Sequence, residues 1–192
     1  GGAAGDELAS ACTDPQALYE AYRAVANRYQ VDTIDFDIEL EGLQDDAAHA
    51  RRAEALARLQ RDRAGESPLQ AWLTLPVQPD GLEASSQMAV EVTLANEVEL
   101  AGVNIMTMSF GSGGVTAASM ADTAEDAARA THEQLAEIYE RAGLPLSDKL
   151  VWNHMGLTPM IGQNDLPEQV LDLENEDYES ILVEFQQGYE AH

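Results

Sequence analysis

The feature that most constrains the fold of this sequence is its alternation between short strand-like and longer helix-like stretches. The stretch "VDTIDFDIE" (31–39) precedes a helical run at 46–63, and "AWLTLPV" (71–77) precedes the polar turn "QPDG" and a helical run near 86–100. Strands separated by helices of this length are typical of βα units, which assemble into a parallel sheet. The sequence therefore predicts an α/β fold.

The alternation continues to the end of the chain. The stretch "GVNIMTMSF" (102–110) precedes a long helix near 120–142, and "GLTPMIG" (156–162) leads through "QNDLPE" into a last helix near 167–190. Upstream, Asp14 and Pro15 are typical of an N-cap and first turn, and they predict a helix that ends near Tyr29.

Two architectures fit these strands. Each strand ends in a loop rich in Gly, Asn, Asp or Pro, which suits a (β/α) barrel with its functional groups at the carboxyl ends of the strands. However, four clear strands and a stump at residues 1–4 are fewer than eight, and a typical barrel needs about 250 residues. The chain of 192 residues is therefore either an open doubly wound sheet or part of a barrel.

Charge excludes two classes of partner. Thirty-five acidic residues face ten basic ones, and Lys149 is the only lysine. A basic patch for nucleic acid is therefore absent, and an anionic membrane surface would repel the chain. Salt would screen the self-repulsion of the acids, so we expect a high-salt source.

The single cysteine, Cys12, excludes an internal disulfide and a cysteine zinc site. No run reaches the roughly 18 apolar residues of a membrane span.

Three acids, Asp35, Asp37 and Glu39, occupy alternate positions of the strand at 31–39 and so share one side of it. In an open parallel sheet, helices cover both faces and the strands are apolar throughout. A row of acids instead favours a barrel, where inward side chains meet a wet or ligand-filled mouth. The opposite side of the strand is apolar: Ile34, Phe36 and Ile38.

Crowded carboxylates raise each other's pKa, so Glu39, the last of the row, would stay protonated near neutral pH and act as a general acid. Protonation of a leaving oxygen in glycoside hydrolysis is the chemistry that this suggests. Two alternatives remain open for the stretch itself. It is also compatible with a solvated polar face of an acid-rich protein and with a magnesium or calcium site.

At this point the motif Asp32-x-x-Asp35-x-Asp37-x-Glu39 resembles the signature strand of glycoside hydrolase family 18, the retaining chitinases. Three further stretches follow in the family's order: "TLPVQPDGL" (74–82), "VNIMTMSFG" (103–111) and "LTPMIGQND" (157–165). Together they resemble the bacterial and archaeal subgroup that carries "TLP", "VNIMTMDYG" and "TPMIGxND". The opening "GGAAG" is similar to the end of that family's third barrel strand.

The resemblance implies a (β/α)8 TIM-barrel-type fold that is incomplete here, from about the end of strand 3 to helix 7. It implies a single partial catalytic domain over 1–192. Against the family's pattern, the first two strands, most of the third, and the eighth are missing. Because an unclosed parallel sheet leaves exposed edges, three alternatives stay open: the chain is a fragment, it pairs with another copy, or it folds differently from the complete enzyme.

The resemblance also implies a function, an endo-acting chitinase that cuts β-1,4 bonds between N-acetylglucosamine units with retention. In such enzymes Glu39 matches the proton donor, Asp37 the acid that orients the 2-acetamido group, and Asp35 the inner acid that shares charge with Asp37. The nucleophile is the substrate's own N-acetyl carbonyl, which gives an oxazolinium intermediate. No metal or organic cofactor is therefore expected, and the expected setting is extracellular, with chitin or chitooligosaccharide as substrate.

Further positions match the family's sugar pocket. Met106 and Met108 would floor it, and Asn164 and Asp165 would bind sugar hydroxyls or the acetamido group. Ordinary barrel packing is the alternative for the methionines. For Asp165 the alternative is the N-terminal turn of the following helix.

One departure concerns the family's "MDYG", which here reads "MSFG", so Ser109 and Phe110 replace an acid and a phenol. That neighbourhood helps to hold the acetamido group, and losing both partners would remove several kcal/mol of transition-state stabilisation. A second hypothesis is therefore a catalytically weak or inactive chitin- or glycan-binding relative. A third is an endo-β-N-acetylglucosaminidase acting on N-glycans or peptidoglycan.

Overall fold

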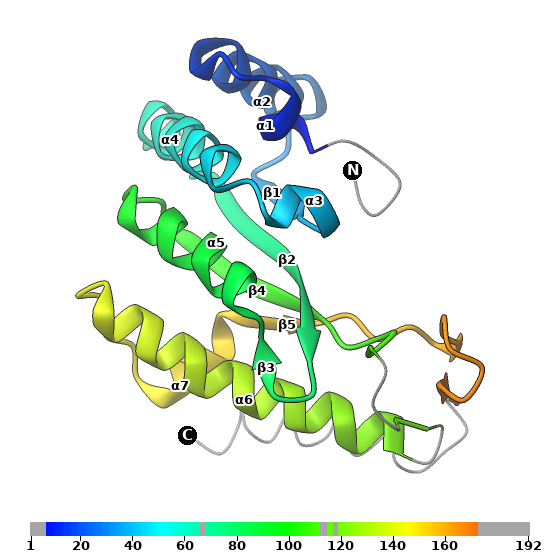
Figure 1. Cartoon of the computed structure of the whole chain (residues 1–192). Coiled ribbons are helices and arrows are strands. Elements are labelled where there is room, and N and C mark those ends of the chain that lie inside the picture. The colour runs from blue at the N-terminus through cyan, green and yellow to red at the C-terminus, as the bar shows by residue number, and fades with distance from the viewer. Residues whose placement is uncertain (1–6, 66–67, 112–114, 117–118, 173–192) are drawn as a thin grey trace. The chain divides into compact units, whose positions relative to one another are not determined.

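The structure is a computed structural model that describes residues 7–65, 68–111, 115–116 and 119–172 (Figure 1). The helices are α1 (Leu8–Ala11), α2 (Pro15–Tyr29), α3 (Leu40–Leu43), α4 (Asp46–Arg63), α5 (Ala84–Ala95), α6 (Met120–Arg141) and α7 (Asp148–Asn153). The strands are β1 (Thr33–Asp37), β2 (Gln70–Gln78), β3 (Gly81–Leu82), β4 (Leu100–Met106), β5 (Met155–Leu157), β6 (Gly162–Gln163) and β7 (Val170–Leu171).

The chain divides into two compact units. Unit 1 is Gly1–Leu75 with Ala84–Val103, and unit 2 is Pro76–Glu83 with Asn104–His192. The main sheet has the strand order β1-β2-β4-β5, and the strands β2 and β4 run from one unit into the other. Among the described residues β1 and β5 form its edges, so this part of the chain does not close a barrel. The single-domain assignment of 1–192 stays a prediction.

The sheet of unit 1 is parallel at β1 and β2, as the βα rhythm predicts, with Asp35 opposite Trp72 and Asp37 opposite Thr74. Successive residues of these strands point to opposite faces. The residues of one face are buried in the core of unit 1, among them Phe36, Ile38, Leu73 and Leu75. Helix α4 packs between α2 and α5 (Figure 1).

Local signals set the helix bounds of unit 1. Asp14 is the N-cap of α2, where its Oδ1 accepts hydrogen bonds from the backbone N–H groups of Gln16 (2.9 Å) and Ala17 (3.4 Å). The helix starts at Pro15 and ends at Tyr29, which confirms that prediction. Helix α4 also has the predicted bounds, whereas α5 ends at Ala95, short of the predicted 100, because β4 begins at Leu100.

In unit 2 the turn "QPDG" closes a hairpin in which β2 and β3 pair antiparallel, with Val77 opposite Leu82 and Gln78 opposite Gly81. Gln134 of α6 holds this hairpin. Its Oε1 accepts a hydrogen bond from the N–H of Leu82 (2.7 Å), and its Nε2 donates to the carbonyl of the same residue (3.3 Å). Gly81 has a φ of 103°, and a Cβ at this position would collide with Gln134.

The predicted strand at 156–162 is only partly right. β5 ends at Leu157, although the N–H of Thr158 still donates to the carbonyl of Ile105 (2.9 Å). The next residue is Pro159, and proline is typically confined to the ends, edges and bulges of sheets.

The predicted helix near 167–190 is wrong at Val170–Leu171, which form β7 and pair antiparallel with β6. Two backbone bonds turn the chain here: the N–H of Asn164 donates to the carbonyl of Gln169, and the N–H of Gln169 donates to that of Leu166 (both 2.9 Å). Residues 173–190 of that helix and the strand stump at 1–4 lie outside the described residues. No helix of the described part has the length and apolar character that crossing a bilayer requires.

Candidate active site

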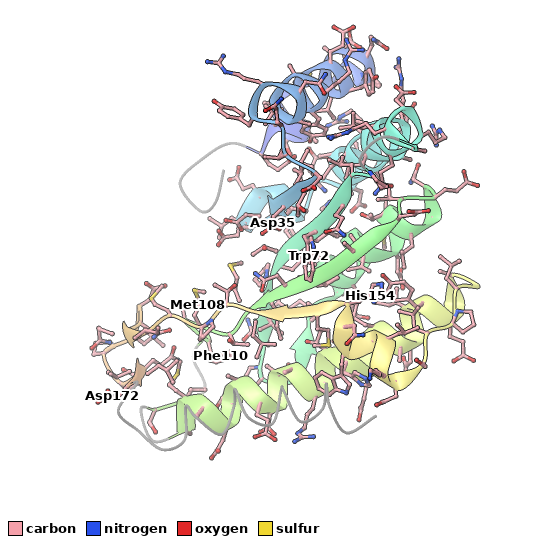
Figure 2. The ribbon with its side chains drawn as sticks, turned by 180° about the vertical axis from the view of Figure 1, so that it is seen from behind. Asp35, Trp72, Met108, Phe110, His154 and Asp172 are labelled. Atoms are coloured by element: carbon pink, nitrogen blue, oxygen red, sulfur yellow. The ribbon has the colours of Figure 1, made fainter. Side chains whose placement is uncertain are left out.

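The acid row lies on β1 and on the residues that follow it. Asp35 and Asp37 are exposed and Glu39 is half-buried, while Phe36 and Ile38 between them are buried. The alternation predicted from the sequence is therefore present, and the three acids share the face of the strand opposite the core of unit 1. Figure 2 labels Asp35 on this strand.

Thr74 of β2 holds this row in two ways. Its Oγ1 donates to Asp35 and lies 2.9 Å from Oδ1 and 2.8 Å from Oδ2. Its carbonyl accepts a hydrogen bond from the N–H of Ile38 (3.0 Å), one residue beyond the end of β1. Thr74 is only 7% exposed, so it fixes both the inner acid and the backbone next to Glu39.

Glu39 is the N-cap residue of α3 and has an extended backbone, with φ −133° and ψ 167°. The next residue, Leu40, has a φ of 49°, in the left-handed region that is unfavourable for a residue with a Cβ. Backbone strain of this kind is enriched at functional sites. The strained turn lies between the end of β1 at Asp37 and helix α3, so Glu39 stands just beyond the carboxyl end of the strand. The raised pKa expected for Glu39 stays a prediction.

A hydrophobic base supports the acid row. The ring of Phe36 contacts that of Tyr22 of α2 edge-on, with ring centroids 5.2 Å apart. Burial raises the pKa of Tyr22 well above its ordinary value of 10.0, and the nearby carboxylate of Glu7 adds to this, so the phenol stays neutral. The face of β1 below the acids is therefore packed.

Unit 2 gathers a second polar cluster around Asn164, which is 4% exposed. Its Oδ1 accepts a hydrogen bond from the N–H of Ser109 (2.8 Å), and its Nδ2 donates to the carbonyls of Met160 (3.0 Å) and Gly162 (3.3 Å). The N–H of Asp165 lies 3.5 Å from Ser109 Oγ. The side chain of Asn164 thus ties the loop after β4 to the loop before β6.

The ring of Phe110 is buried in unit 2 with 1% exposure. Its carbonyl accepts a hydrogen bond from Nε2 of Gln169 (2.6 Å), which is itself 1% exposed. In this structure Phe110 is therefore a packing residue, and its contact with a sugar stays a prediction. Gln169 connects the hairpin of β6 and β7 to the loop after β4.

Met106 ends β4, and Met108 follows it in a tight turn in which the N–H of Met108 donates to the carbonyl of Met106 (2.9 Å). Both side chains are half-buried, and Figure 2 labels Met108 beside Phe110. Their predicted role as the floor of a sugar pocket stays a prediction.

The structure thus forms two clusters, each within one unit. Unit 1 holds Asp35, Asp37 and Glu39 along a strand, and unit 2 holds Ser109, Asn164 and Asp165 in adjoining loops. Within the described ranges, no group of three or more His, Cys, Asp or Glu side chains is arranged to hold a metal ion.

Sequence reasoning missed Thr74 and Gln169. Thr74 opens the "TLP" stretch, but its position opposite Asp37 depends on the register between β1 and β2, which the sequence does not show. Gln169 also gave no signal, because it falls in the helix predicted near 167–190 and its hydrogen-bond partner, Phe110, lies 59 positions away.

Comparison with known proteins finds several relatives, although no protein-family model matches the chain. The chain is 32% identical over 180 residues to the probable bifunctional chitinase/lysozyme of Escherichia coli strain K12. It is 31% identical over 180 residues to Endochitinase 11 of Metarhizium anisopliae. Each match covers 90% of this chain, which spans 20% of the first relative's length and 34% of the second's.

Solved structures match the fold. The crystal structure of the catalytic domain of the hyperthermophilic chitinase from Pyrococcus furiosus superimposes with a TM-score of 0.82 at 31% identity. Catalytic-site mutants of active domain 2 of the thermostable chitinase of this organism, complexed with chito-oligosaccharides, superimpose with a TM-score of 0.80 at 30% identity. These matches cover 98% and 97% of this chain and 56% of the other chains. They confirm the predicted barrel-type α/β fold, of which this chain carries part.

Proposed function

Because this chain is a relative of chitinases in both sequence and fold, we propose that it is an endo-acting chitinase-type glycosidase. It would hydrolyse β-1,4 bonds between the N-acetylglucosamine units of chitin and chitooligosaccharides. One observation supports the proposal most: the row of Asp35, Asp37 and Glu39 at the carboxyl end of β1, with its inner member held by Thr74. The carboxyl ends of the strands are where barrel enzymes carry their catalytic groups.

In the proposed mechanism, Glu39 donates a proton to the glycosidic oxygen as the bond from that oxygen to the anomeric carbon breaks. The substrate's N-acetyl carbonyl oxygen attacks this carbon and forms an oxazolinium ion. Glu39, now ionised, takes a proton from the water that opens the ring, so the configuration is retained. Asp37 orients the acetamido group and balances the positive charge of the oxazolinium. No second nucleophilic carboxylate is needed.

The spacing of the three acids along β1 and just beyond it is compatible with these separate roles. Alternate residues of a strand lie about 6–7 Å apart along one face, so Asp37 reaches both neighbours while Asp35 is remote from the outer acid. Because Thr74 donates to Asp35, the inner carboxylate has a fixed partner of its own.

The test is turnover by the purified 192-residue chain of a chitotriose glycoside that releases a chromophore on cleavage. Glu39→Gln should abolish the release, because an amide supplies no catalytic proton. The matched control is Glu41→Gln on the exposed side of α3, which should keep the wild-type rate. Turnover that survives Glu39→Gln would refute the assignment of the general acid.

The substitution of Ser109 and Phe110 for the family's acid and phenol favours a second candidate, a glycan-binding relative of low activity. Binding of chitotriose by calorimetry, with no chromophore release at any salt concentration, would support this candidate and exclude the hydrolase. The endo-β-N-acetylglucosaminidase alternative differs only in substrate, so release from N-glycans or peptidoglycan in place of chitotriose would support it.

The proposed setting is extracellular and saline. Thirty-five acidic residues against ten basic ones support a salt-rich medium, because counter-ions screen their repulsion. The edge strands of the described sheet, β1 and β5, support self-association as a further proposal. Light scattering of the purified chain at two concentrations would test it, and a constant monomer mass would contradict it.

A further inference from the structure

A buried histidine connects the two helices that follow the acid row. His49 of α4 has no exposed surface. Its Nε2 lies 3.1 Å from the carbonyl oxygen of Leu43, the last residue of α3, and its Nδ1 lies 3.0 Å from Nη1 of Arg52. One imidazole thus joins the end of α3 to the interior of α4, and Figure 1 shows the two helices as neighbours.

The two partners determine the protonation state of this ring. A carbonyl oxygen only accepts hydrogen bonds and a guanidinium only donates them. The ring must therefore carry its proton on Nε2 and present an unprotonated Nδ1 to Arg52. A second proton on Nδ1 would point at an N–H of the guanidinium, which removes that hydrogen bond and places two positive charges in contact.

The surroundings hold Arg52 in place. Its guanidinium is 1% exposed, its Nε donates to Glu7 Oε1 (3.3 Å), and its Nη2 lies 3.2 Å from Glu7 Oε2 without hydrogen-bond geometry. Arg52 therefore cannot turn away from a charged ring without abandoning Glu7.

The charged groups that interact with His49 are Asp46 and Arg52 of α4, Asp45 at its N-cap, and Glu7 before α1. The neighbouring helices α2, α3 and α5 carry Tyr22, Glu41 and Glu91 among their titratable residues. Burial lowers the pKa of His49 from its ordinary value of 6.5 and the charge of Arg52 lowers it further, while the hydrogen bond to Leu43 and the acids Asp46 and Glu7 oppose this.

We call the contacts of the His49 ring with Leu43 and Arg52 the clamp. It acts directly on the segment that carries Glu39. Helix α3 has four residues, begins immediately after Glu39, and ends at Leu43, which is 4% exposed. Helices this short have no stability of their own. The backbone that presents Glu39 is therefore held at one side by the bond between Ile38 N–H and the Thr74 carbonyl, and at the other by His49.

We infer that His49 is a positioning residue, whose neutral ring fixes α3 and with it Glu39, and whose protonation releases α3. The effect on turnover rests on the proposed role of Glu39, whereas the release of α3 is a property of the fold alone. Below pH 6.5 the unfolded chain takes up a proton on this histidine that the folded chain does not. Stability therefore falls as the pH drops from 6.5 toward the folded pKa, with up to a tenfold rise in the unfolding constant per pH unit.

His49→Gln is the informative variant, because its amide offers one donor for the Leu43 carbonyl and one acceptor for Arg52, and it does not titrate. Amide hydrogen exchange of residues 38–45, corrected for the intrinsic effect of pH, is measured at pH 7.5 and 5.0. We expect wild-type exchange to accelerate at least fivefold at the lower pH while that of His49→Gln stays constant. Equal acceleration in both proteins would overturn the inference.

A second experiment measures the free energy of unfolding in urea at the same two pH values. The other carboxylates are the same in wild type and His49→Gln, so their effect cancels in the difference between the two proteins. Wild type should lose stability relative to His49→Gln as the pH falls; a constant difference would overturn the clamp. His49→Leu, which removes the hydrogen bonds that the ring makes to Leu43 and Arg52, should accelerate exchange of 38–45 at both pH values, and unchanged exchange would contradict the clamp.

The third measurement is kcat for chitotriose glycoside cleavage against pH. His49→Gln should match wild type at pH 7.5 and retain at least threefold more of its activity at pH 5.0. If wild type shows no turnover, the proposed function fails while the exchange and unfolding measurements still decide the clamp. If turnover is present and the two pH profiles coincide, the positioning role fails alone.

Discussion

The hydroxyl of Thr74 reaches both carboxylate oxygens of Asp35, at 2.9 and 2.8 Å, from the strand beside it. A hydrogen bond to a charged group contributes about 1.5–3 kcal/mol. Thr74→Val keeps the shape of this side chain and removes the donor, so we predict a roughly tenfold or greater fall in kcat with little change in KM. Thr74→Ser keeps the hydroxyl donor, so its kcat should stay close to that of wild type.

A matched control exists on the same face of the sheet. Thr33 is exposed at the start of β1, and its Oγ1 lies 3.4 Å from Gln70 Oε1. Thr33→Val should leave kcat within about twofold of wild type. A comparable loss in both variants would mean that the effect comes from the sheet and not from Asp35.

Asn164 makes three hydrogen bonds to backbone groups from a buried position, one of them to the N–H of Ser109. Asn164→Leu would leave these groups without that partner, which costs about 2–4 kcal/mol of the free energy of unfolding. Urea denaturation measures this loss. The same change at the exposed Asn153 should alter stability by less than about 0.5 kcal/mol, and a similar loss there would count against the role of Asn164.

The two departures from the family's pattern differ in how easily they can be reversed. Ser109 has a φ of 45°, and an aspartate tolerates this region better than most residues, so Ser109→Asp should fold normally. If the missing acid limits turnover, kcat should rise about tenfold or more in a chromogenic chitotriose assay. An unchanged rate would show that the acid is not what limits this chain.

Phe110→Tyr should behave differently, because the ring of Phe110 is 1% exposed. A hydroxyl added to a buried ring loses its hydration, which costs about 1–3 kcal/mol unless a partner is present. We predict a lower urea midpoint for this variant and an unchanged one for Ser109→Asp. A more stable Phe110→Tyr would reveal a hydrogen-bond partner at this position.

Salt should stabilise the chain, since its formal charge is −25. Raising potassium chloride from 0.1 to 2 M screens repulsion among the acids, and we expect the thermal midpoint to rise by several degrees. Sucrose at matched osmolarity is the control for effects unrelated to charge. A midpoint that responds equally to both solutes would exclude electrostatic screening.

Short-range signals made part of the fold predictable. The bounds of α2 and α4 follow from Asp14, Pro15 and helical periodicity, and the acid row follows from strict alternation along β1. The sequence predicts a helix where β7 lies, because Pro167 resembles a first helical residue. The hydrogen bond from the N–H of Asn164 to the carbonyl of Gln169, which makes the hairpin, joins two backbone groups and leaves no residue signature.

The supporting residues of the site were predictable only in part. Thr74 bonds to a residue 39 positions away, so its role depends on the register between β1 and β2. The same holds for Gln169, which reaches the carbonyl of Phe110 across 59 positions. Residue type predicts which side chains carry charge, whereas their supports depend on which backbone atoms the fold brings near them.

The hydrogen bonds between Gln134 and the β2–β3 hairpin have an evolutionary consequence. Its amide contacts the main chain of Leu82 and the carbonyl of Asp80, so it recognises a backbone path and not the side chains at the tip. Gly81 is restricted in identity, because its φ is 103° and a Cβ there would collide with Gln134. The side chains of the exposed positions 79 and 80 take no part in these hydrogen bonds, so relatives can present different side chains there while the main chain keeps its path.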